Sequence, residues 1–335
     1  RVIILGEDVG KNGGVFRATQ GLRERFGSRR VLDTPLAENL IAGVSVGMSS
    51  QGLRPVAEIQ FLGFIYAALE HLISHAARLR NRTRGRLSCP LTIRTPFGGG
   101  IHAPEHHSES TEAILCHIAG LKVVALSSPR TAYGLLLAAI RCPDPVIVLE
   151  PERIYRSFKE DVLDDGQQIE LEQCLVWRKG TDITLIAWGA MVQDCLHAAE
   201  QLAQHGIEAE VIDVACLKPL DIETIINSVA LTGRCVIVQE AVKSGGLGSD
   251  IFNGNDGDDY LEEQNAGNNI LNGGKGNDYL SVSFNDSLST NILNGGEGDD
   301  TLITRNSSST NILDGGQGND TLTGGDSKDI YIFNR

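Results

Sequence analysis

The sequence predicts an α/β protein with two successive parallel-sheet units, the second one truncated, followed by a C-terminal parallel β-roll. Strand-length apolar runs alternate with amphipathic helical runs through residues 1–249, a pattern typical of a parallel sheet covered on both faces. From residue 250 onward a motif rich in Gly, Asn and Asp recurs at 254, 273, 295, 315 and 324, and such periodicity predicts a solenoid. Residues 250–335 hold 15 Asp or Glu against 4 Lys or Arg, whereas residues 1–249 hold 28 against 25. We therefore expect a change of domain between Ser249 and Asp250.

The first unit, residues 1–150, alternates strands with helices. We expect its strands at Val2–Leu5, Pro55–Gln60, Leu91–Arg94, Lys122–Leu126 and Pro145–Leu149. We expect its helices at Leu40–Gln51, Ile65–Arg80, Ser108–His117 and Arg130–Arg141. Ser128-Pro129 is a typical start signal for the last helix, and Cys142-Pro143 is a typical stop signal.

The second unit is predicted to be shorter. Residues 151–180 are polar and irregular and are expected to form a connector. A βαβαβ run follows in 181–249, with elements at Asp182–Trp188, Met191–His205, Glu208–Val214, Asp221–Ala230 and Cys235–Gln239. It ends at a glycine turn, residues 244–249, that no helical pattern follows. We therefore expect the second domain to be truncated. Because Arg1 directly precedes a strand pattern, we also expect that residues before Arg1 are missing.

Composition excludes several classes of function. The net charge of −14 opposes binding to nucleic acid or anionic membranes, and no apolar run approaches the ~20 residues of a membrane span. No signal peptide is apparent. All seven Cys precede residue 236 without a CxxC pair, which is typical of reduced thiols in a cytosolic protein. The acidic tail should attract hard cations.

Two segments of the first unit carry candidate chemistry. Asp33-Thr-Pro-Leu-Ala-Glu38 ends a strand and opens a helix, which places a carboxylate where it could reach a ligand over the sheet edge. Pro104-Glu-His-His-Ser-Glu109 follows a glycine turn, and a loop His there suits acid or base chemistry better than zinc binding. Taken alone, the first segment is better explained as a charge at a helix N-terminus, and the second as a pair of surface His residues.

A series of motifs in a fixed order carries a resemblance to a known family. The motifs are GEDVG (6–10), GGVFRATQGL (13–22), DTPLAE (33–38), GLRPVAEIQF (52–61), TPFGGG (95–100), EHHSE (105–109), GLKVV (120–124), DPVIVLEP (144–151) and QEAVKSGG (239–246). This order resembles the beta subunit of the thiamine-diphosphate-dependent 2-oxo acid dehydrogenases, of pyruvate, branched-chain or acetoin type. The resemblance spans 1–249 and implies a transketolase-like pyrimidine-binding domain, followed by part of a transketolase C-terminal-like domain.

The resemblance implies specific roles for four residues. Glu38 is similar to the catalytic glutamate that bonds the N1′ atom of the cofactor's aminopyrimidine, and Leu36 and Phe64 are similar to the side chains that hold that ring. His107 matches the histidine that faces the reaction intermediate and the incoming lipoyl group, with His106 as the alternative one position away. The implied reaction is oxidative decarboxylation of a 2-oxo acid with acyl transfer to lipoyl.

The resemblance also implies partners and ions. An alpha subunit would bind the diphosphate and its magnesium, in a heterotetramer of two alpha and two beta subunits that docks on a lipoyl-bearing acyltransferase core in the cytoplasm. Potassium would bind around Ala139, Cys142 and Asp144, although Cys142 stands where the family has an acidic side chain. Which 2-oxo acid is used stays open.

The tail resembles a second family. Its motifs, GNDGDDYLE, GGKGNDYLS, GGEGDDTLI and GGQGNDTLT, are similar to the RTX nonapeptide GGxGxDxLx of secreted calcium-binding β-rolls. The implied calcium ligands are Asp259, Asp278, Asp300 and Asp320, with Asp329 in a weaker fifth copy. The apolar residue two positions after each Asp, Leu261, Leu280, Leu302, Leu322 or Tyr331, should face the coil core.

Three interpretations remain open. The chain is a dehydrogenase beta subunit with an accessory calcium module, a secreted calcium-binding RTX protein whose front part is a passenger, or a non-functional fusion of two partial genes. The first is favoured for chemistry because the motifs of half an active site are all present in 1–150.

Overall fold

The computed structural model describes residues 1–242, 245–248, 258–263, 269–285, 290–307, 310–325 and 329–332. The expected junction between Ser249 and Asp250 and the first glycine turn at 254–257 lie outside these residues. The chain forms two compact units, one of residues 1–180, 185–228 and 238–242 and the other of residues 181–184, 229–237 and 243–335. Within the described ranges, no helix has both the length and the apolar character needed to cross a membrane.

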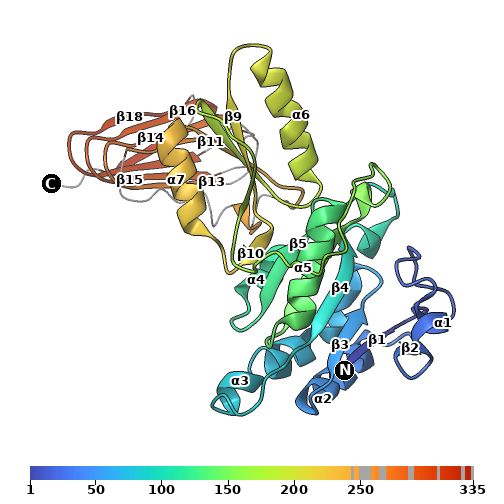
Figure 1. The fold of residues 1–335 in the computed structure, drawn as a ribbon. Helices are drawn as coiled ribbons and strands as arrows, with labels where there is room; N and C mark the ends of the chain where they lie inside the picture. Colours follow the sequence, from blue (N-terminus) through green and yellow to red (C-terminus); the bar gives the residue numbers. More distant parts are fainter. Residues whose placement is uncertain are drawn as a thin grey trace. The chain divides into compact units, whose positions relative to one another are not determined.

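The first sheet has seven strands in the order β10-β5-β6-β4-β3-β1-β2 (Figure 1). Their bounds are β1 Val2–Gly6, β2 Val31–Asp33, β3 Arg54–Glu58, β4 Thr92–Phe97, β5 Lys122–Ala125, β6 Val146–Pro151 and β10 Cys216–Lys218. All neighbours are parallel except β10 and β5. Every residue of β4 and β6 is buried, as expected for central strands covered on both faces. The predicted parallel sheet is confirmed.

The helices of the first sheet follow most of the predicted runs. They are α1 Leu22–Phe26, α2 Glu38–Ser50, η1 Leu62–Ala68, η2 His71–Ala76, α3 Leu79–Arg82, η3 Glu105–His107, α4 Glu112–His117, α5 Pro129–Arg141 and η4 Glu152–Ile154. Helix α5 begins with a capping box, in which the Ser128 hydroxyl accepts a hydrogen bond from the Thr131 N–H at 3.2 Å. Pro129 at the first helical position suits this start.

The predicted helix at Ile65–Arg80 is helical over most of its length but is not a single regular α-helix. The segment is a 3₁₀ turn (η1), a π turn (η2) and one short α-helical turn (α3). Residues 65–80 contain no Pro or Gly, so local propensity does not explain the change of winding between η1 and η2. Both η1 and η2 pack against α2, and the His71 ring lies directly over Gly43 of that helix. We attribute the irregular winding to this close approach, which a regular α-helix would not fit.

The second sheet has the order β11-β8-β9-β7. Its strands are β7 Leu175–Arg178, β8 Ile183–Ala187, β9 Ala209–Asp213 and β11 Cys235–Val238, with helices α6 Met191–Ala203 and α7 Ile222–Thr232. The expected connector therefore contains a strand, β7, which pairs antiparallel with β9. Strand β10 was also not predicted, and it pairs with β5 in the first sheet rather than with a strand of the second sheet.

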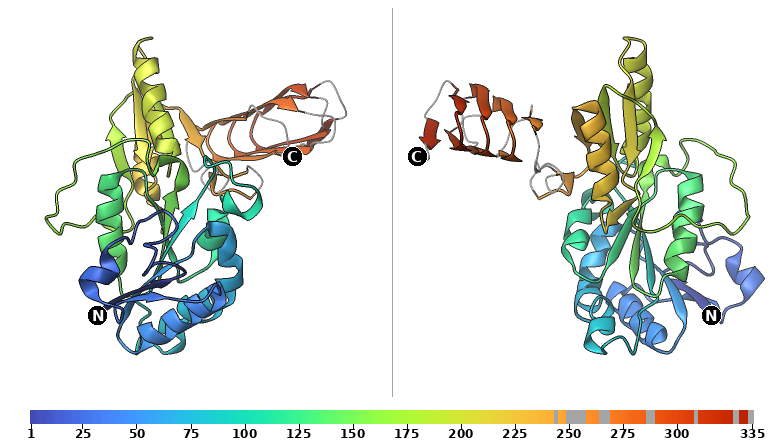
Figure 2. Two further views of the ribbon diagram at one scale, coloured as in Figure 1. Left: turned by 90° about the vertical axis from the view of Figure 1, so that its right-hand side faces the viewer. Right: turned by 60° about the vertical axis from the view of Figure 1, so that its left-hand side comes forward.

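The tail is a two-sheet parallel roll (Figure 2). One sheet holds β12 Tyr260–Glu263, β14 Tyr279–Asn285, β16 Thr301–Ser307 and β18 Thr321–Thr323. The other holds β13 Asn269–Lys275, β15 Thr290–Glu297, β17 Thr310–Gln317 and β19 Asp329–Ile332. The solenoid prediction is confirmed, because every pair of neighbours is parallel and in register.

The roll encloses a narrow leucine core. Leu280 and Leu302 are fully buried, and Leu261 and Leu322 pack against the same cluster, as predicted. Tyr331 is 41% exposed, so the expectation that it fills the core is wrong. It lies on β19, the edge strand of its sheet, where it is aligned with Leu313 but has a neighbouring strand on one side only.

Candidate functional site

The predicted site residues lie at the carboxyl edge of the first sheet. Glu38 begins α2 after β2, Phe64 lies in η1 after β3, and His107 lies in η3 after β4. Helix α2 packs against η1, and η1 packs against η3. Three segments that are distant in sequence therefore meet at one edge, where open parallel sheets bind their ligands.

Aromatic rings form the best-defined part of this edge. The ring centroids of Phe64 and His107 are 5.2 Å apart at an interplanar angle of 80°, an edge-to-face arrangement. Phe61 lies 4.6 Å from the His107 ring and 5.7 Å from the ring of Phe16. The sequence motifs identified Phe64 and His107 but not Phe61 or Phe16. The final F of EIQF and the F of GGVFR were the available signals.

The orientation of His107 fixes its tautomer. Its Nδ1 lies 3.1 Å from the carbonyl oxygen of Pro104. A carbonyl oxygen only accepts hydrogen bonds, so Nδ1 must carry the hydrogen. The other ring nitrogen, Nε2, is then the atom that can accept or return a proton.

The other two predicted residues are more open. Glu38 is half-buried as the first residue of α2, and the Leu36 side chain is 73% exposed. Burial, Asp8 and then Glu38 raise the pKa of Glu7, so the Glu7 and Glu38 carboxyls share one electrostatic environment. No hydrogen bond or ring contact joins Glu38 or Leu36 to the aromatic cluster anywhere in residues 1–242. The structure therefore brings together Phe64 and His107 and leaves one side of the site open.

A buried charge network lies under this edge and was not predicted. The Arg94 guanidinium bonds Glu150 through Nε at 2.7 Å and Nη2 at 2.6 Å, and Nη1 also bonds Glu58. Tyr155 donates its hydroxyl hydrogen to Glu150. The side chains of Arg94, Glu58 and Glu150 are all at most 8% exposed.

The network has one cation for two carboxylates. Burial lowers the pKa of Arg94, but Glu150 and Glu58 outweigh burial and raise it. Burial, with the nearby charge of Glu150, raises the pKa of Glu58 against the lowering effect of Arg94. The sequence signal was a charged residue inside each of three apolar strands, and the sheet register does place Glu58 opposite Arg94.

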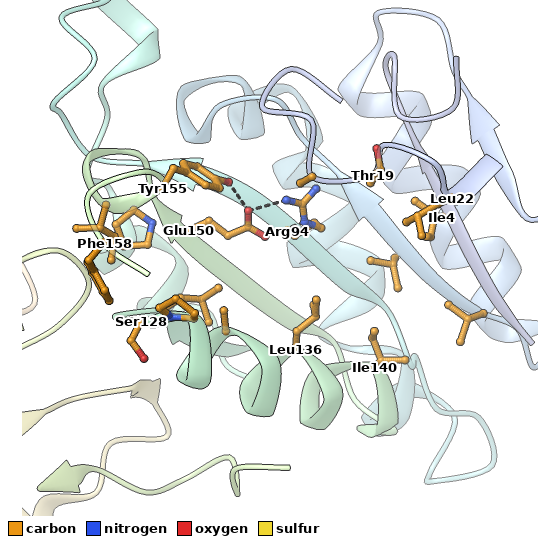
Figure 3. Close-up of a pocket in the computed structure, with 18 residues that line it drawn as sticks. Ile4, Thr19, Leu22, Arg94, Ser128, Leu136, Ile140, Glu150, Tyr155 and Phe158 are labelled. Carbon is orange, nitrogen blue, oxygen red and sulfur yellow. Dashed lines mark hydrogen bonds and ion pairs between the residues drawn. The ribbon is translucent and has the colours of Figure 1, made fainter. Parts of the chain in front are cut away.

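A cavity of about 340 Å³ lies beside α5, over the first sheet (Figure 3). Its walls are apolar, with Ile4 from β1 and Leu136 and Ile140 from α5. Figure 3 shows Arg94 and Tyr155 both reaching Glu150 at its polar end. None of the four predicted site residues lines this cavity, but Tyr155 at its polar end stacks on Phe16 of the aromatic cluster, with ring centroids 4.9 Å apart.

Three acidic side chains lie around the glycine turn that precedes His107. The Gly99 N–H donates to Glu240 Oε1 at 2.7 Å, and the Trp188 Nε1–H donates to Glu112 Oε1 at 3.0 Å. Glu152 is 4% exposed, and both of its carboxyl oxygens are buried without a partner. Burial, followed by the charge of Glu240, raises the pKa of Glu152 to about 7. Glu152 is therefore largely protonated below neutral pH.

Replacement of Glu152 by Gln should remove a pH dependence of stability. The pKa of Glu152 is raised in the folded state, so the protonated side chain stabilises the fold. This stabilisation is complete below about pH 4.5 and is lost as the pH rises through about 7. Between pH 5 and pH 8, the free energy of unfolding of the parent chain should fall by up to about 3 kcal/mol, whereas that of Glu152→Gln should stay the same. Urea unfolding at both pH values measures this. The exposed Glu200→Gln is the control, and parallel profiles for the parent and Glu152→Gln would contradict the assignment.

Four of the predicted calcium ligands line one edge of the roll, whereas the fifth, Asp329, lies on β19 opposite Asn311 and accepts a hydrogen bond from it. The N–H groups of Asp259, Asp278 and Asp300 donate to Oδ1 of the Asp in the following turn, at 2.8, 2.7 and 3.0 Å. Asp278 and Asp300 are 2% and 1% exposed, and their Oδ2 atoms are buried without partners. Burial raises the pKa of both, against the lowering effect of the backbone hydrogen bonds. Unpaired buried carboxylate oxygens fit a hard cation.

Carboxylates alone do not complete a calcium site. No group of three His, Cys, Asp or Glu side chains converges within the described residues, so backbone carbonyls of the turns must supply further ligands. The turns stack closely enough for this. A Cβ on Gly298, which has φ of 139°, would collide with the Gly276 carbonyl oxygen of the preceding turn.

Substitution of Gly298 by Ala should therefore disrupt the roll. Both the positive φ and the collision with the Gly276 carbonyl oppose a side chain, and we expect a loss of at least about 2 kcal/mol in calcium-saturated buffer. Thermal unfolding followed by circular dichroism measures the loss. Gly206 also has a positive φ, 76°, but open space around it, so Gly206→Ala should cost less. Equal losses would show that turn stacking is not the cause.

The predicted potassium residues lie at the end of α5. The Arg54 Nη1 donates to the carbonyl oxygens of Ile140 and Cys142 at 2.7 and 3.0 Å, and the Arg80 Nε donates to Asp144 Oδ1 at 2.6 Å. The Ala139 carbonyl accepts from the Cys142 N–H. A guanidinium therefore already satisfies one of the carbonyls that the resemblance gives to potassium.

Comparison with known families matches three regions. Residues 1–157 match the family described as transketolase, pyrimidine binding domain, and residues 172–264 match transketolase, C-terminal domain. Residues 265–284, 286–308 and 305–335 match the RTX calcium-binding nonapeptide repeat.

Individual relatives agree with these matches. The pyruvate dehydrogenase E1 component subunit beta of Bacillus subtilis is 50% identical over 250 residues, which is 75% of this chain and 77% of the relative. The protein of the same name from Acholeplasma laidlawii is 49% identical over 251 residues, with the same coverage. Among solved structures, a split gene transketolase, described as an inactive beta4 tetramer, matches with a TM-score of 0.60 and 25% identity over 75% of this chain and 76% of that one.

Proposed function

The chain belongs to the family of pyruvate dehydrogenase E1 beta subunits, and we propose that it supplies the aminopyrimidine side of a thiamine-diphosphate site that oxidatively decarboxylates a 2-oxo acid and passes the acyl group to lipoyl. The observation that carries this proposal is the meeting of α2, η1 and η3 at one sheet edge, with Phe64 and His107 in edge-to-face contact. Half of a site is present there, and its open side needs a partner.

The residues of this edge fit the cofactor's pyrimidine. Phe64 and Leu36 would flank the ring, and the half-buried Glu38 carboxyl would hold a proton at N1′. Thiamine diphosphate, when bound, supplies the nucleophilic carbon that makes decarboxylation possible. His107 would present Nε2 to the substrate, since Nδ1 is committed to the Pro104 carbonyl.

The proposed partner is an alpha subunit that binds the diphosphate and its magnesium. Exposed apolar side chains beside the site support such an interface. Leu36 is 73% exposed, and Leu40 and Val44, each 42% exposed, are four residues apart on α2 and therefore share one helix face. A heterotetramer of two alpha and two beta subunits, docked on a lipoyl-bearing acyltransferase core in the cytoplasm, completes the proposal.

Potassium would bind at the end of α5, where two arginines already contact the expected ligands. It would have to displace Arg54 from the Cys142 carbonyl or share that oxygen with it, next to Ala139 and an Asp144 already paired with Arg80. An ion held by backbone carbonyls is still consistent with a thiol at position 142, because a Cys side chain is not needed as a ligand.

Reconstitution tests the enzymatic proposal. The full chain is mixed with alpha subunits of the pyruvate, branched-chain and acetoin types, and 2-oxo-acid-dependent reduction of an artificial electron acceptor is measured with thiamine diphosphate and magnesium. Co-elution and turnover with one alpha subunit would support the proposal and identify the substrate. Failure of all three alpha subunits to co-elute with a folded chain would contradict it.

A calcium-binding function is favoured independently by the buried unpaired oxygens of Asp278 and Asp300. We expect calcium to bind the roll and increase its β-structure, whether or not the enzyme half is active. Repeats of this family are typical of secreted proteins, so this function would predominate in an exported chain or in a fusion whose front part is inactive. A circular dichroism spectrum that does not change at millimolar calcium would contradict it.

A further inference from the structure

The two edges of the roll are chemically different. At one edge, GGxGxD turns connect β13 to β14, β15 to β16 and β17 to β18. The sequence between β14 and β15 is DSLS (286–289) and that between β16 and β17 is SS (308–309), both without a glycine, whereas the sequence between β18 and β19 begins with the fifth glycine motif at 324. The first two segments lead into Asn291 and Asn311, which occupy the place that Asp holds after each glycine turn. The edge that carries Asp259, Asp278, Asp300 and Asp320 is called the turn edge below, and the edge that carries Asn291, Asn311 and Asp329 is called the amide edge.

The turn edge is incomplete without a cation. The carboxylates of Asp278, Asp300 and Asp320 each receive one backbone N–H on Oδ1. The Oδ2 atoms of Asp278 and Asp300 have no partner although both residues are at most 2% exposed. A buried carboxylate oxygen without a partner is costly. A calcium ion between adjacent turns would satisfy it.

The amide edge is complete without one. Asn291 and Asn311 are both 0% exposed. The Asn291 Nδ2–H donates to Asn311 Oδ1 at 2.7 Å, and the Asn311 Nδ2–H donates to Asp329 Oδ1 at 2.6 Å. The strands keep these residues opposite one another, Asn291 to Asn311 and Asn311 to Asp329. An amide donates and accepts at once, so a row of amides pairs along the stack, as Asn ladders do in stacked sheets.

We propose that calcium occupies only the turn edge of the roll and that the amide edge is a metal-independent hydrogen-bonded ladder that sets the strand register. The proposal rests on calcium binding by the roll. Three successive contacts, Asp259 to Asp278, Asp278 to Asp300 and Asp300 to Asp320, define three gaps between turns. The roll should therefore bind about three calcium ions, rather than filling both edges.

Ion counting on the full chain tests the proposal. Calcium bound at saturation is measured by equilibrium dialysis for the parent and for a control in which Asp278, Asp300 and Asp320 are all replaced by Asn. The difference between the two is the number held by the turn edge, and the ions left on the control report any site elsewhere. We expect the parent to bind about three ions and the control none in the roll.

Two matched variants separate the edges. Asn311→Leu keeps a similar volume but removes the ladder, and should leave the ion number unchanged while lowering the unfolding midpoint at saturating calcium by at least about 4 °C. Asp300→Asn should remove the ions on both sides of its turn. An ion number of five or more, or loss of ions in a folded Asn311→Leu chain, would overturn the one-edge proposal while leaving calcium binding intact. A parent that binds no calcium in the roll would overturn both.

Discussion

Replacement of Glu38 by Gln is expected to lower turnover of the reconstituted enzyme by about 10²- to 10⁴-fold with little change in stability. The carboxyl group lies at the first position of α2, half-buried, where it can hold a proton for a bound pyrimidine nitrogen. A glutamine keeps the size and the hydrogen-bonding reach but cannot exchange a proton. Steady-state turnover of the complex with the alpha subunit, at saturating cofactor, measures the loss.

The neighbouring carboxyl provides a matched control. Burial, Asp8 and Glu38 raise the pKa of Glu7, so this carboxyl lies in the same charged region as Glu38. The Glu7→Gln variant therefore changes the local charge but keeps the Glu38 carboxyl that is proposed to hold the proton. It should cost less than about tenfold. Retention of turnover within threefold in Glu38→Gln, or an equal loss in Glu7→Gln, would show that Glu38 has no specific role. Unfolding curves of both variants check that the fold is intact.

Replacement of Arg94 by Met is expected to destabilise the first unit by about 3–5 kcal/mol. The guanidinium is the partner that the sheet provides for both Glu58 and Glu150, and all three side chains are at most 8% exposed. Its removal leaves two carboxylates close together in a dry environment. At neutral pH no positive charge then offsets the free-energy cost of burying the Glu58 and Glu150 carboxylates. Urea unfolding of the full chain at pH 7.5 measures the change.

A triple variant distinguishes loss of charge balance from loss of packing. Combining Arg94→Met with Glu58→Gln and Glu150→Gln removes the unpaired charges along with the cation, so most of the lost stability should return. If the triple variant is as unstable as Arg94→Met alone, the effect comes from packing around β4 and the network assignment is wrong.

The sheet could be predicted because its signal is local. Runs such as Val146–Leu149 are apolar at every position, and only a strand covered on both faces needs that pattern. The irregular η1 and η2 could not be predicted, because their winding depends on the approach of α2 at Gly43 and not on their own residues. Strand β7 was missed for a related reason. Its residues are mostly half-buried and show only a weak alternation of apolar and polar side chains, so the strand is recognised only from its pairing with β9.

The candidate site divides in the same way. Phe64 and His107 were identified by their motifs, but their contact depends on where η1 and η3 meet. The Arg94 network was overlooked because three charges in three distant strands look unrelated until the register places Glu58 opposite Arg94. The aspartates of the roll were identified because each sits at a fixed position in a repeated motif. The different roles of Asp300 and Asn311 became visible only in the structure, where strand pairing sets the hydrogen-bond partners of each residue.

Strand β10 has a consequence for how the first unit unfolds. It follows β9 of the second sheet almost directly, yet it pairs antiparallel with β5 and thereby covers an edge of the first sheet. Exposed strand edges recruit other chains into intermolecular aggregates, so this short segment acts as a cap against self-association. It also makes the two sheets mechanically interdependent: detachment of Cys216–Lys218 would uncover one sheet while pulling on the other, so both should melt together in a single cooperative step.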